Sequence, residues 1–271
     1  MSRTSERLLW IPLVALLLVP VARHLAIHHR TRDGGGWTLF EGLGALDSAL
    51  AAASGRPVLL NFWATWCGPC VAELHLIEAA ADSAGDGAVV LAVSIGDRSP
   101  EDVRRFLEAG GTGLTVIWLD ADDASAAVER FDLPDAVPVT IVLNPDGVET
   151  ARAVGAREAG WFTGRLEAAS GGGAGPDTTA SSSGAGAHVN IVGSRSDSLA
   201  SALEAEAVRL AGREAVDFFD PSLPEDSAAA AALFLPFDDL PYAQPCYGGA
   251  CGRPVRDPAE LEGAIARLAA P

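Results

Sequence analysis

The sequence contains no lysine, so every basic side chain other than histidine is an arginine. There are 19 arginines against 36 aspartates and glutamates, which gives a formal net charge of −17 over 271 residues. Binding to nucleic acid needs a basic surface, and this balance argues against it and against broad adhesion to anionic lipid. A solvated acidic surface is the simplest interpretation, and a role in the selection of partners is the alternative.

Cysteine is also scarce, but it occurs in pairs. The four cysteines are Cys67 with Cys70 and Cys246 with Cys251, so none is left over. Such pairing suits an oxidising compartment, although a cytosolic redox enzyme could show it too. We see no internal repeat that relates the two halves of the chain.

The first 36 residues are predicted to form a membrane anchor followed by a glycine-rich tether. An apolar run over residues 8–22 reaches membrane-spanning length only if it continues past Arg23 and His24 to Ile27. A cleaved signal peptide is the alternative, but residues 20–22 make a poor cleavage site. Arginines after the run outnumber those before it, which taken alone would leave the body of the protein in the cytoplasm.

The most informative stretch is residues 58–70. It begins as a run of apolar and β-prone residues, typical of a buried strand, and ends in Cys67-Gly68-Pro69-Cys70. Apolar residues at helical spacing follow, which predicts that the two cysteines lie on the first turn of a helix. The free N–H groups and the dipole there favour an anion, so the Cys67 thiol should ionise readily. A thiolate attacks disulfides, and a second thiol one turn away can resolve the mixed disulfide.

The rest of the chain is predicted to form two α/β units. Strands that alternate with helices and then form a hairpin predict an α/β layer fold over residues 37–169. A Gly/Ser/Ala-rich linker is expected at 170–187. A second, small α/β domain of βαβ type is expected at 188–271. Its strands are predicted at 189–192, 215–219 and 230–235.

The segment Asn61-Phe62-Trp63-Ala64-Thr65-Trp66-Cys67-Gly68-Pro69-Cys70 resembles the motif of the TlpA/ResA-type thiol-disulfide oxidoreductases. These are membrane-anchored, extracytoplasmic members of the thioredoxin superfamily, and the resemblance covers residues 37–169. It implies a thioredoxin-like fold, with Cys67 as the nucleophile, Cys70 as the resolving thiol and no cofactor. A metal site is the alternative for such a pair. Redox chemistry is favoured because structural zinc usually needs a second pair at matching depth.

Other residues near the dithiol receive roles from the same resemblance. Glu73 matches an acidic residue of the family and is expected to handle a proton, with a solvated surface acid as the alternative. Pro138 matches a cis-proline that faces the dithiol, and with Val137 and Trp66 it is expected to position substrate. Asn61 is expected to form structural hydrogen bonds beside the site. Trp63 is expected to pack around the dithiol, with a plain core residue as the alternative. His75 stands where the family usually has a proline and is expected on the helix surface.

The C-terminal part resembles a second family over short segments. Residues 189–193, 246–251 and 254–261 look similar to the C-terminal end of the spermatogenesis-associated thioredoxin-domain family, which implies a βαβ-type module and no known activity. Cys246 and Cys251 are expected to form a structural disulfide across the flexible residues 247–250. The alternatives are an electron relay to Cys67 and Cys70, and free thiols or a metal site.

Two functions follow from these patterns. The first is a single-pass enzyme of the cytoplasmic membrane whose body faces the periplasm, since the resemblance outweighs the arginine count. It would exchange disulfides with protein substrates, as a reductant fed by a membrane or periplasmic electron donor, with cytochrome c maturation as one role. The second is a redox-linked binding module, in which residues 188–271 recruit a client or partner.

Overall fold

The computed structural model describes residues 37–171, 177–180 and 186–269. The predicted anchor and tether at residues 1–36 lie outside this part of the chain. Among the described residues, no helix is both long enough and apolar enough to span a membrane.

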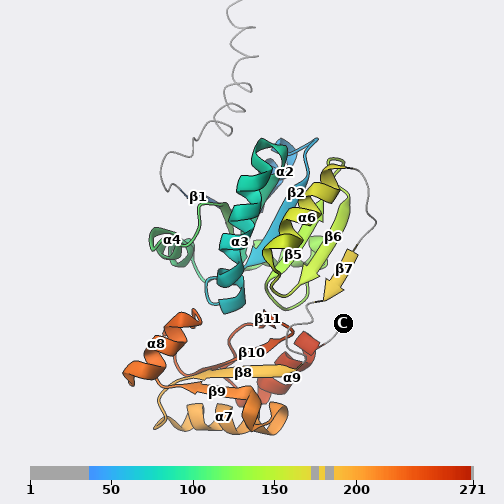
Figure 1. The fold of residues 1–271 in the computed structure, drawn as a ribbon. Coiled ribbons are helices and arrows are strands. Elements are labelled where there is room, and N and C mark those ends of the chain that lie inside the picture. The colour runs from blue at the N-terminus through green and yellow to red at the C-terminus, as the bar shows by residue number, and fades with distance from the viewer. Residues whose placement is uncertain (1–36, 172–176, 181–185, 270–271) are drawn as a thin grey trace, which may run out of the picture. The chain divides into compact units, whose positions relative to one another are not determined.

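The first sheet has seven strands in the order β1-β4-β3-β2-β5-β6-β7 (Figure 1). Strands β1 to β4 are parallel, β2 pairs antiparallel with β5, β5 pairs antiparallel with β6, and β7 returns parallel to β6. The strands are β1 (Thr38–Glu41), β2 (Val58–Trp63), β3 (Val89–Ile95), β4 (Thr115–Leu119), β5 (Val139–Leu143), β6 (Glu149–Val154) and β7 (Asp177–Ala180). The predicted thioredoxin-like α/β fold is confirmed, and β7 lies within the stretch expected to be a linker.

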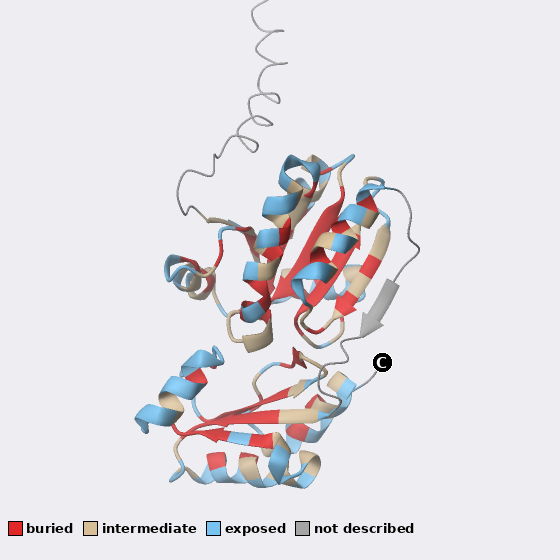
Figure 2. Cartoon of the chain, in the orientation of Figure 1, coloured by how far each residue is buried: buried red, intermediate tan, exposed pale blue. Residues whose placement is uncertain are grey.

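Helices connect these strands and cover the sheet. They are α2 (Leu43–Ala52), α3 (Gly68–Ala84), α4 (Pro100–Glu108), α5 (Ala121–Phe131) and α6 (Ala159–Ser170), with a short 3₁₀ turn, η1, at Gly85–Gly87. Helices α3 and α6 pack side by side on one face of the sheet (Figure 1). Strand β2 is buried along its whole length because it lies at the centre of the sheet (Figure 2). This central strand carries the chain directly to the two cysteines.

The second sheet has four strands in the order β11-β10-β8-β9. Strands β8 and β9 are parallel and are joined by α7, which confirms the predicted βαβ unit. Apolar side chains from these elements form a core of their own, with Val189, Ile191, Leu203 and Leu261 among its buried members. The elements are β8 (Ala187–Val192), α7 (Ser198–Ala211), η2 (Arg213–Ala215), β9 (Val216–Phe219), α8 (Pro224–Ala232), β10 (Tyr242–Tyr247), β11 (Ala250–Cys251) and α9 (Pro258–Ala269).

The strand predicted at residues 230–235 is wrong, because the structure has helix α8 over Pro224–Ala232. This segment contains a run of alanines, and alanine has the highest helix propensity of any residue type. Pro224 stands in the first turn with Glu225 and Asp226, which is a normal helix start. The true third strand of this sheet, β10, contains Pro245 and follows Pro241, and such prolines argue against a strand in a sequence.

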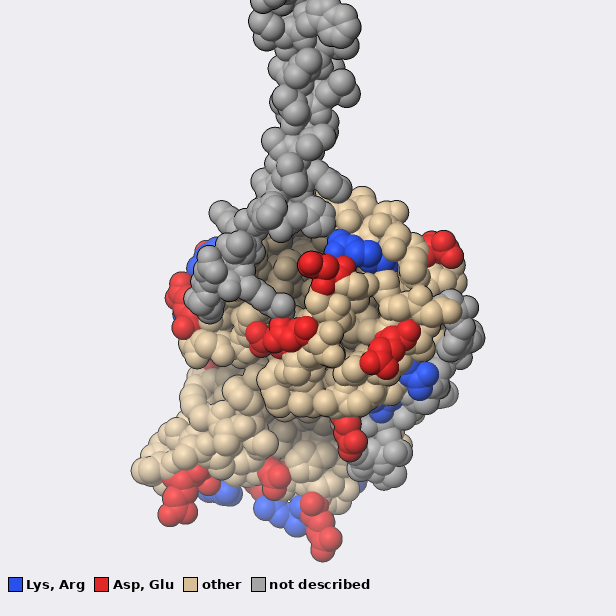
Figure 3. All heavy atoms as spheres, turned by 45° about the horizontal axis from the view of Figure 1, so that its top comes forward, with Lys and Arg blue, Asp and Glu red and all other residues tan. Residues whose placement is uncertain are grey.

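The acidic composition does not produce a single acidic patch on the face that Figure 3 shows. Carboxylates and arginines are scattered there among uncharged residues. Several arginines form ion pairs with nearby acids, as Arg152 does with Glu149 at 2.8 Å. The excess of acid is therefore distributed over this face of the molecule.

Candidate functional site

Cys67 and Cys70 form a disulfide at the start of α3. Cys67 is the N-cap residue of the helix, and its sulfur accepts a hydrogen bond from the Cys70 backbone N–H at 3.2 Å. An N–H group that points at this sulfur stabilises a thiolate once the disulfide is reduced. The prediction that the dithiol lies at the start of a helix is thus confirmed. The hydrogen bond from this N–H goes to the Cys67 sulfur.

The turn between the two cysteines is tightly enclosed. Pro69 lies in the first turn of α3, where its fixed φ angle suits a helix start and its missing N–H costs no hydrogen bond. Gly68 has no space for a side chain, because an added Cβ would collide with the carbonyl oxygen of Leu233. Both cysteine side chains have a solvent exposure of 0%. An external protein therefore has no direct access to Cys67 in this state.

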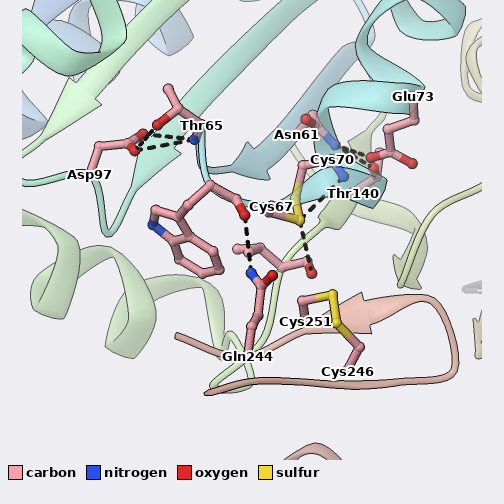
Figure 4. Close-up of a disulfide and its surroundings, with 12 residues drawn as sticks. Asn61, Thr65, Cys67, Cys70, Glu73, Asp97, Thr140, Gln244, Cys246 and Cys251 are labelled. Atoms are coloured by element: carbon pink, nitrogen blue, oxygen red, sulfur yellow. Dashed lines mark hydrogen bonds between the residues drawn. A yellow bond between two sulfur atoms is a disulfide. The ribbon is translucent and has the colours of Figure 1, made fainter. Parts of the chain in front are cut away.

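The residues Val137 and Pro138 lie beside the dithiol, as the resemblance implied. The Val137–Pro138 peptide bond is cis, and both residues are buried. The Val137 carbonyl oxygen lies 3.6 Å from the Cys67 sulfur (Figure 4). These residues lead directly into β5, which pairs with β2 and so holds the loop against the end of the strand that precedes Cys67.

Glu73 is buried behind the dithiol, one helical turn after Cys70, with 2% of its surface exposed. Its carboxylate accepts hydrogen bonds from Asn61 Nδ2 at 2.8 Å and from the Arg157 backbone N–H at 3.0 Å. Burial raises the pKa of Glu73 to about 8, and these hydrogen bonds oppose part of that shift. A carboxyl group with this pKa can both hold and release a proton near neutral pH. Because Glu73 is buried, the alternative of a solvated surface acid is excluded.

Asn61 connects Glu73 to the neighbouring strand. Its Nδ2 also donates to Thr140 Oγ1 on β5 at 3.0 Å (Figure 4). Asn61 itself is fully buried on β2. The expectation that Asn61 is a hydrogen-bonding residue beside the site is confirmed, and the structure adds Thr140 to the network.

A second buried carboxylate, Asp97, holds the loop that leads into the dithiol. It accepts hydrogen bonds from Thr65 N at 3.2 Å, from Thr65 Oγ1 at 2.6 Å and from Ser94 Oγ at 2.6 Å. Burial raises the pKa of Asp97, and the hydrogen bonds from Ser94 and Thr65 oppose that shift. Asp97 was not predicted from the sequence, although an acid just after β3 was a usable signal, since neighbouring parallel strands end at one edge of a sheet.

The remaining predicted side chains lie in three different environments. Trp66 is half-buried at the site, and its indole N–H donates to Gly96 O at 3.2 Å. Trp63 is fully buried and packs against Phe106 with 5.1 Å between ring centroids, so it belongs to the core. His75 is exposed on α3, as expected.

The second cysteine pair lies at the same site. Cys246 and Cys251 form a disulfide between paired residues of β10 and β11. Cys251 also pairs antiparallel with Val137, and Gln244 of β10 donates from Nε2 to the Trp66 carbonyl oxygen at 3.0 Å (Figure 4). The sequence carried no signal for Gln244, because β10 was not predicted. Among the described residues, no group of three or more histidine, cysteine or acidic side chains is arranged to hold a metal ion.

Comparisons with known proteins agree with this geometry. The Redoxin family matches residues 45–167. Thiol-disulfide oxidoreductase ResA of Bacillus subtilis (strain 168) is 31% identical over 99 residues, which are 36% of this chain and 52% of that protein. Thioredoxin-like protein YneN of the same organism is 41% identical over 103 residues, which are 37% of this chain and 58% of that protein.

The chain thus spans a little over half of the length of these two relatives. It spans more of a thioredoxin from Mycolicibacterium smegmatis, to which it is 33% identical over 105 residues, or 38% of this chain and 70% of that protein. The matched motif, the strand order and the buried disulfide at the start of α3 are mutually consistent. The chain therefore belongs to the thioredoxin-like family, and it is similar over part of its length to the thiol-disulfide oxidoreductase ResA.

Proposed function

We propose that this protein is a thiol-disulfide oxidoreductase that acts on protein substrates. The observation that carries the proposal is the Cys67–Cys70 disulfide at the N-terminus of α3, with the Cys70 N–H directed at the Cys67 sulfur. In the reduced enzyme the Cys67 thiolate attacks a disulfide, and one sulfur of that disulfide leaves. Cys70 then attacks the Cys67 sulfur, which releases the second thiol and restores the enzyme disulfide.

Four further residues act in this cycle. Glu73 accepts the proton that the Cys70 thiol loses before it attacks, since its carboxylate lies one turn away on the same buried face of α3. Val137 and Pro138, with Trp66, position the disulfide that reacts with Cys67, because the Val137 carbonyl oxygen lies 3.6 Å from the Cys67 sulfur.

The cellular setting is also part of the proposal. An apolar segment near the N-terminus anchors the protein in the cytoplasmic membrane, and the body faces the periplasm. There it acts as a reductant that a membrane or periplasmic donor recharges, and apocytochrome c cysteines are one client class. Alkaline phosphatase fused after Gly36 should be active. An inactive phosphatase and an active cytoplasmic reporter at the same position would reverse the orientation.

The enzymatic proposal is tested by reduction of insulin with the full chain. We expect Cys67→Ser to abolish turnover, and Cys70→Ser to stall at mixed disulfides that involve Cys67. His75→Ala is the matched control, because His75 lies exposed on the same helix and should leave turnover unchanged. Wild-type protein that cannot reduce insulin, or a Cys67→Ser variant with full activity, would sink the proposal.

Recruitment of a client by residues 188–271 remains a prediction. The contacts of this region with the dithiol favour a different role, which follows below.

A further inference from the structure

The backbone of Cys251 occupies both hydrogen-bonding groups of Val137. The Cys251 N–H donates to Val137 O at 2.7 Å, and the Val137 N–H donates to Cys251 O at 3.1 Å. The same Val137 carbonyl oxygen lies 3.6 Å from the Cys67 sulfur. Cys251 is thereby held as a short antiparallel strand beside the reactive sulfur, and Figure 4 shows it on the side of the second disulfide that faces Cys67.

Several other hydrogen bonds seat the same segment. Gln244, before Cys246 on β10, donates to the Trp66 carbonyl oxygen at 3.0 Å. The Gly249 carbonyl oxygen, in the turn between the two cysteines, accepts from the Ala156 N–H at 3.3 Å. The strand, the turn and Cys251 are therefore each tied to the loops around the dithiol, so the second disulfide is held in place on both sides.

The sulfurs at the site differ in their exposure to solvent. Cys67 and Cys70 are 0% exposed and Cys251 is 1% exposed, whereas Cys246 is half-buried. Cys246 and Cys251 both line a groove of about 790 Å³ together with Gly68, Pro69 and Tyr247. Cys246 is therefore the most solvent-exposed of the four cysteine residues, and an external thiol is expected to attack there.

We propose that Cys246–Cys251 is a second redox-active disulfide that exchanges electrons with Cys67–Cys70 inside one chain, through a Cys67–Cys251 mixed disulfide. This inference rests on the proposed function, since it needs a redox-active Cys67–Cys70 pair. A purely structural disulfide has no need to lie beside another disulfide. The pairing of Cys251 with Val137 beside Cys67 is what a relay requires.

An external dithiol reduces the Cys246–Cys251 disulfide in the first steps. Its thiolate attacks the Cys246 sulfur, Cys251 leaves as a thiolate, and the second external thiol resolves the mixed disulfide, so that two electrons enter the Cys246/Cys251 pair. The Cys251 thiolate then attacks the Cys67 sulfur, the Cys67–Cys70 bond breaks, and Cys70 leaves and takes a proton. Cys246, after loss of its proton, attacks the Cys251 sulfur and releases Cys67 as a thiolate. One disulfide and one dithiol exist before and after this internal exchange, and the reverse direction uses the same bonds.

The mixed disulfide can be trapped with two matched double variants of the full chain. Cys70→Ser with Cys246→Ser leaves Cys67 and Cys251, and Cys70→Ser with Cys251→Ser leaves Cys67 and Cys246. Equilibration in a glutathione redox buffer measures the effective concentration of each remaining pair of thiols. We expect a value at least about tenfold higher for Cys67 with Cys251, because both residues contact the Val137 carbonyl oxygen. Equal values, or a higher value for Cys67 with Cys246, would overturn the assignment.

A second measurement uses the wild-type chain and does not depend on the folding of a variant. Protein is reduced with one equivalent of dithiothreitol, quenched with acid at intervals and alkylated, and each cysteine pair is quantified by peptide mass spectrometry. We expect thiols to appear first at Cys246 and Cys251 and then to redistribute to Cys67 and Cys70, at a rate that tenfold dilution does not change. Redistribution that slows on dilution, or thiols that stay on one pair, would overturn the relay. Reduction of insulin without redistribution would leave the proposed function standing and remove only this inference.

Discussion

The two disulfides of this protein join the same chemical groups in different settings. Cys67–Cys70 lies at the start of a helix, where the Cys70 N–H points at a sulfur and the buried Glu73 lies one turn away. Cys246–Cys251 joins two paired strands, and the Cys251 N–H is used by Val137 O. The helix supplies a donor and a dipole that stabilise a thiolate, whereas the strand pair supplies neither.

This difference shows that the reactivity of a cysteine pair comes from its surroundings. The first pair has the features of an attacking and leaving thiolate. The second has the features of a substrate, because it is extended, paired with a backbone and partly open to a groove. The two settings can therefore be tested separately.

The largest effect should come from Glu73, which has no counterpart at the second disulfide. We expect Glu73→Gln to slow insulin reduction about 10²-fold, as loss of a positioned proton acceptor commonly does. In wild-type protein the rate should rise with pH through about 8, where Glu73 ionises, and this inflection should be missing in the variant. Glu108→Gln is the control, since it removes an exposed carboxylate. Full activity of Glu73→Gln would show that the resolving step does not need the Glu73 carboxylate as a proton acceptor.

The same carboxyl group should make the free energy of unfolding of the region around the first sheet depend on pH in the oxidised protein. With a pKa raised from 4.5 to about 8, Glu73 is protonated in the folded state while the unfolded state is ionised. The unfolded state then binds fewer protons, so stability falls as pH rises between these values, by up to about 1.4 kcal/mol per pH unit. Urea unfolding at several pH values should show this slope in wild type and Glu108→Gln but a smaller slope in Glu73→Gln. An unchanged slope in Glu73→Gln would assign the dependence to another group.

Removal of the second disulfide should affect the stability of its own sheet. We expect Cys246→Ser with Cys251→Ser to destabilise the second sheet by about 2 kcal/mol, the value expected for a short closed loop. Faster hydrogen exchange at β8 and β10 amides would report it. The control is Cys67→Ser with Cys70→Ser, which should leave exchange at those amides unchanged. Faster exchange confined to the first sheet in the Cys246/Cys251 variant would contradict the expectation.

The smallest effect compares two aspartates that each follow a parallel strand. Burial raises the pKa of Asp97 after β3, whereas hydrogen bonds from Ser222 and from the Arg195 N–H lower the pKa of Asp220 after β9. A raised pKa means that stability is lost as pH rises, and a lowered pKa means that it is lost as pH falls. The destabilisation caused by Asp97→Asn should therefore shrink from acid to neutral pH, and that caused by Asp220→Asn should grow.

Melting temperatures of the two variants and wild type from pH 4 to pH 7 give this comparison. Trends of the same sign for both variants would contradict it. The two positions look alike in sequence, as single acids after apolar strands, so the sign is decided by their tertiary surroundings.

Local features of the first region were predictable. The apolar run before the dithiol predicted β2, and the spacing after it predicted α3 with Cys67 at its start, because these signals involve neighbours within a few residues. The strand predicted at residues 230–235 was wrong because a short apolar run is compatible with a strand and with a helix. The alanines in this run favour a helix. Asp97 was missed because its donors, Thr65 and Ser94, lie on two separate segments.

The sequence by itself determined the dithiol, its place on a helix and the acid one turn later, since cysteine spacing and helix periodicity are written in adjacent residues. Only the tertiary structure decided that Cys67 is buried and that burial raises the pKa of Glu73. It also decided that Cys251 pairs with Val137 and that Gln244 bonds to Trp66, 178 residues away. Backbone pairing between distant segments uses N–H and C=O groups that every residue except proline carries, so it leaves no mark on the side chains from which a sequence is interpreted.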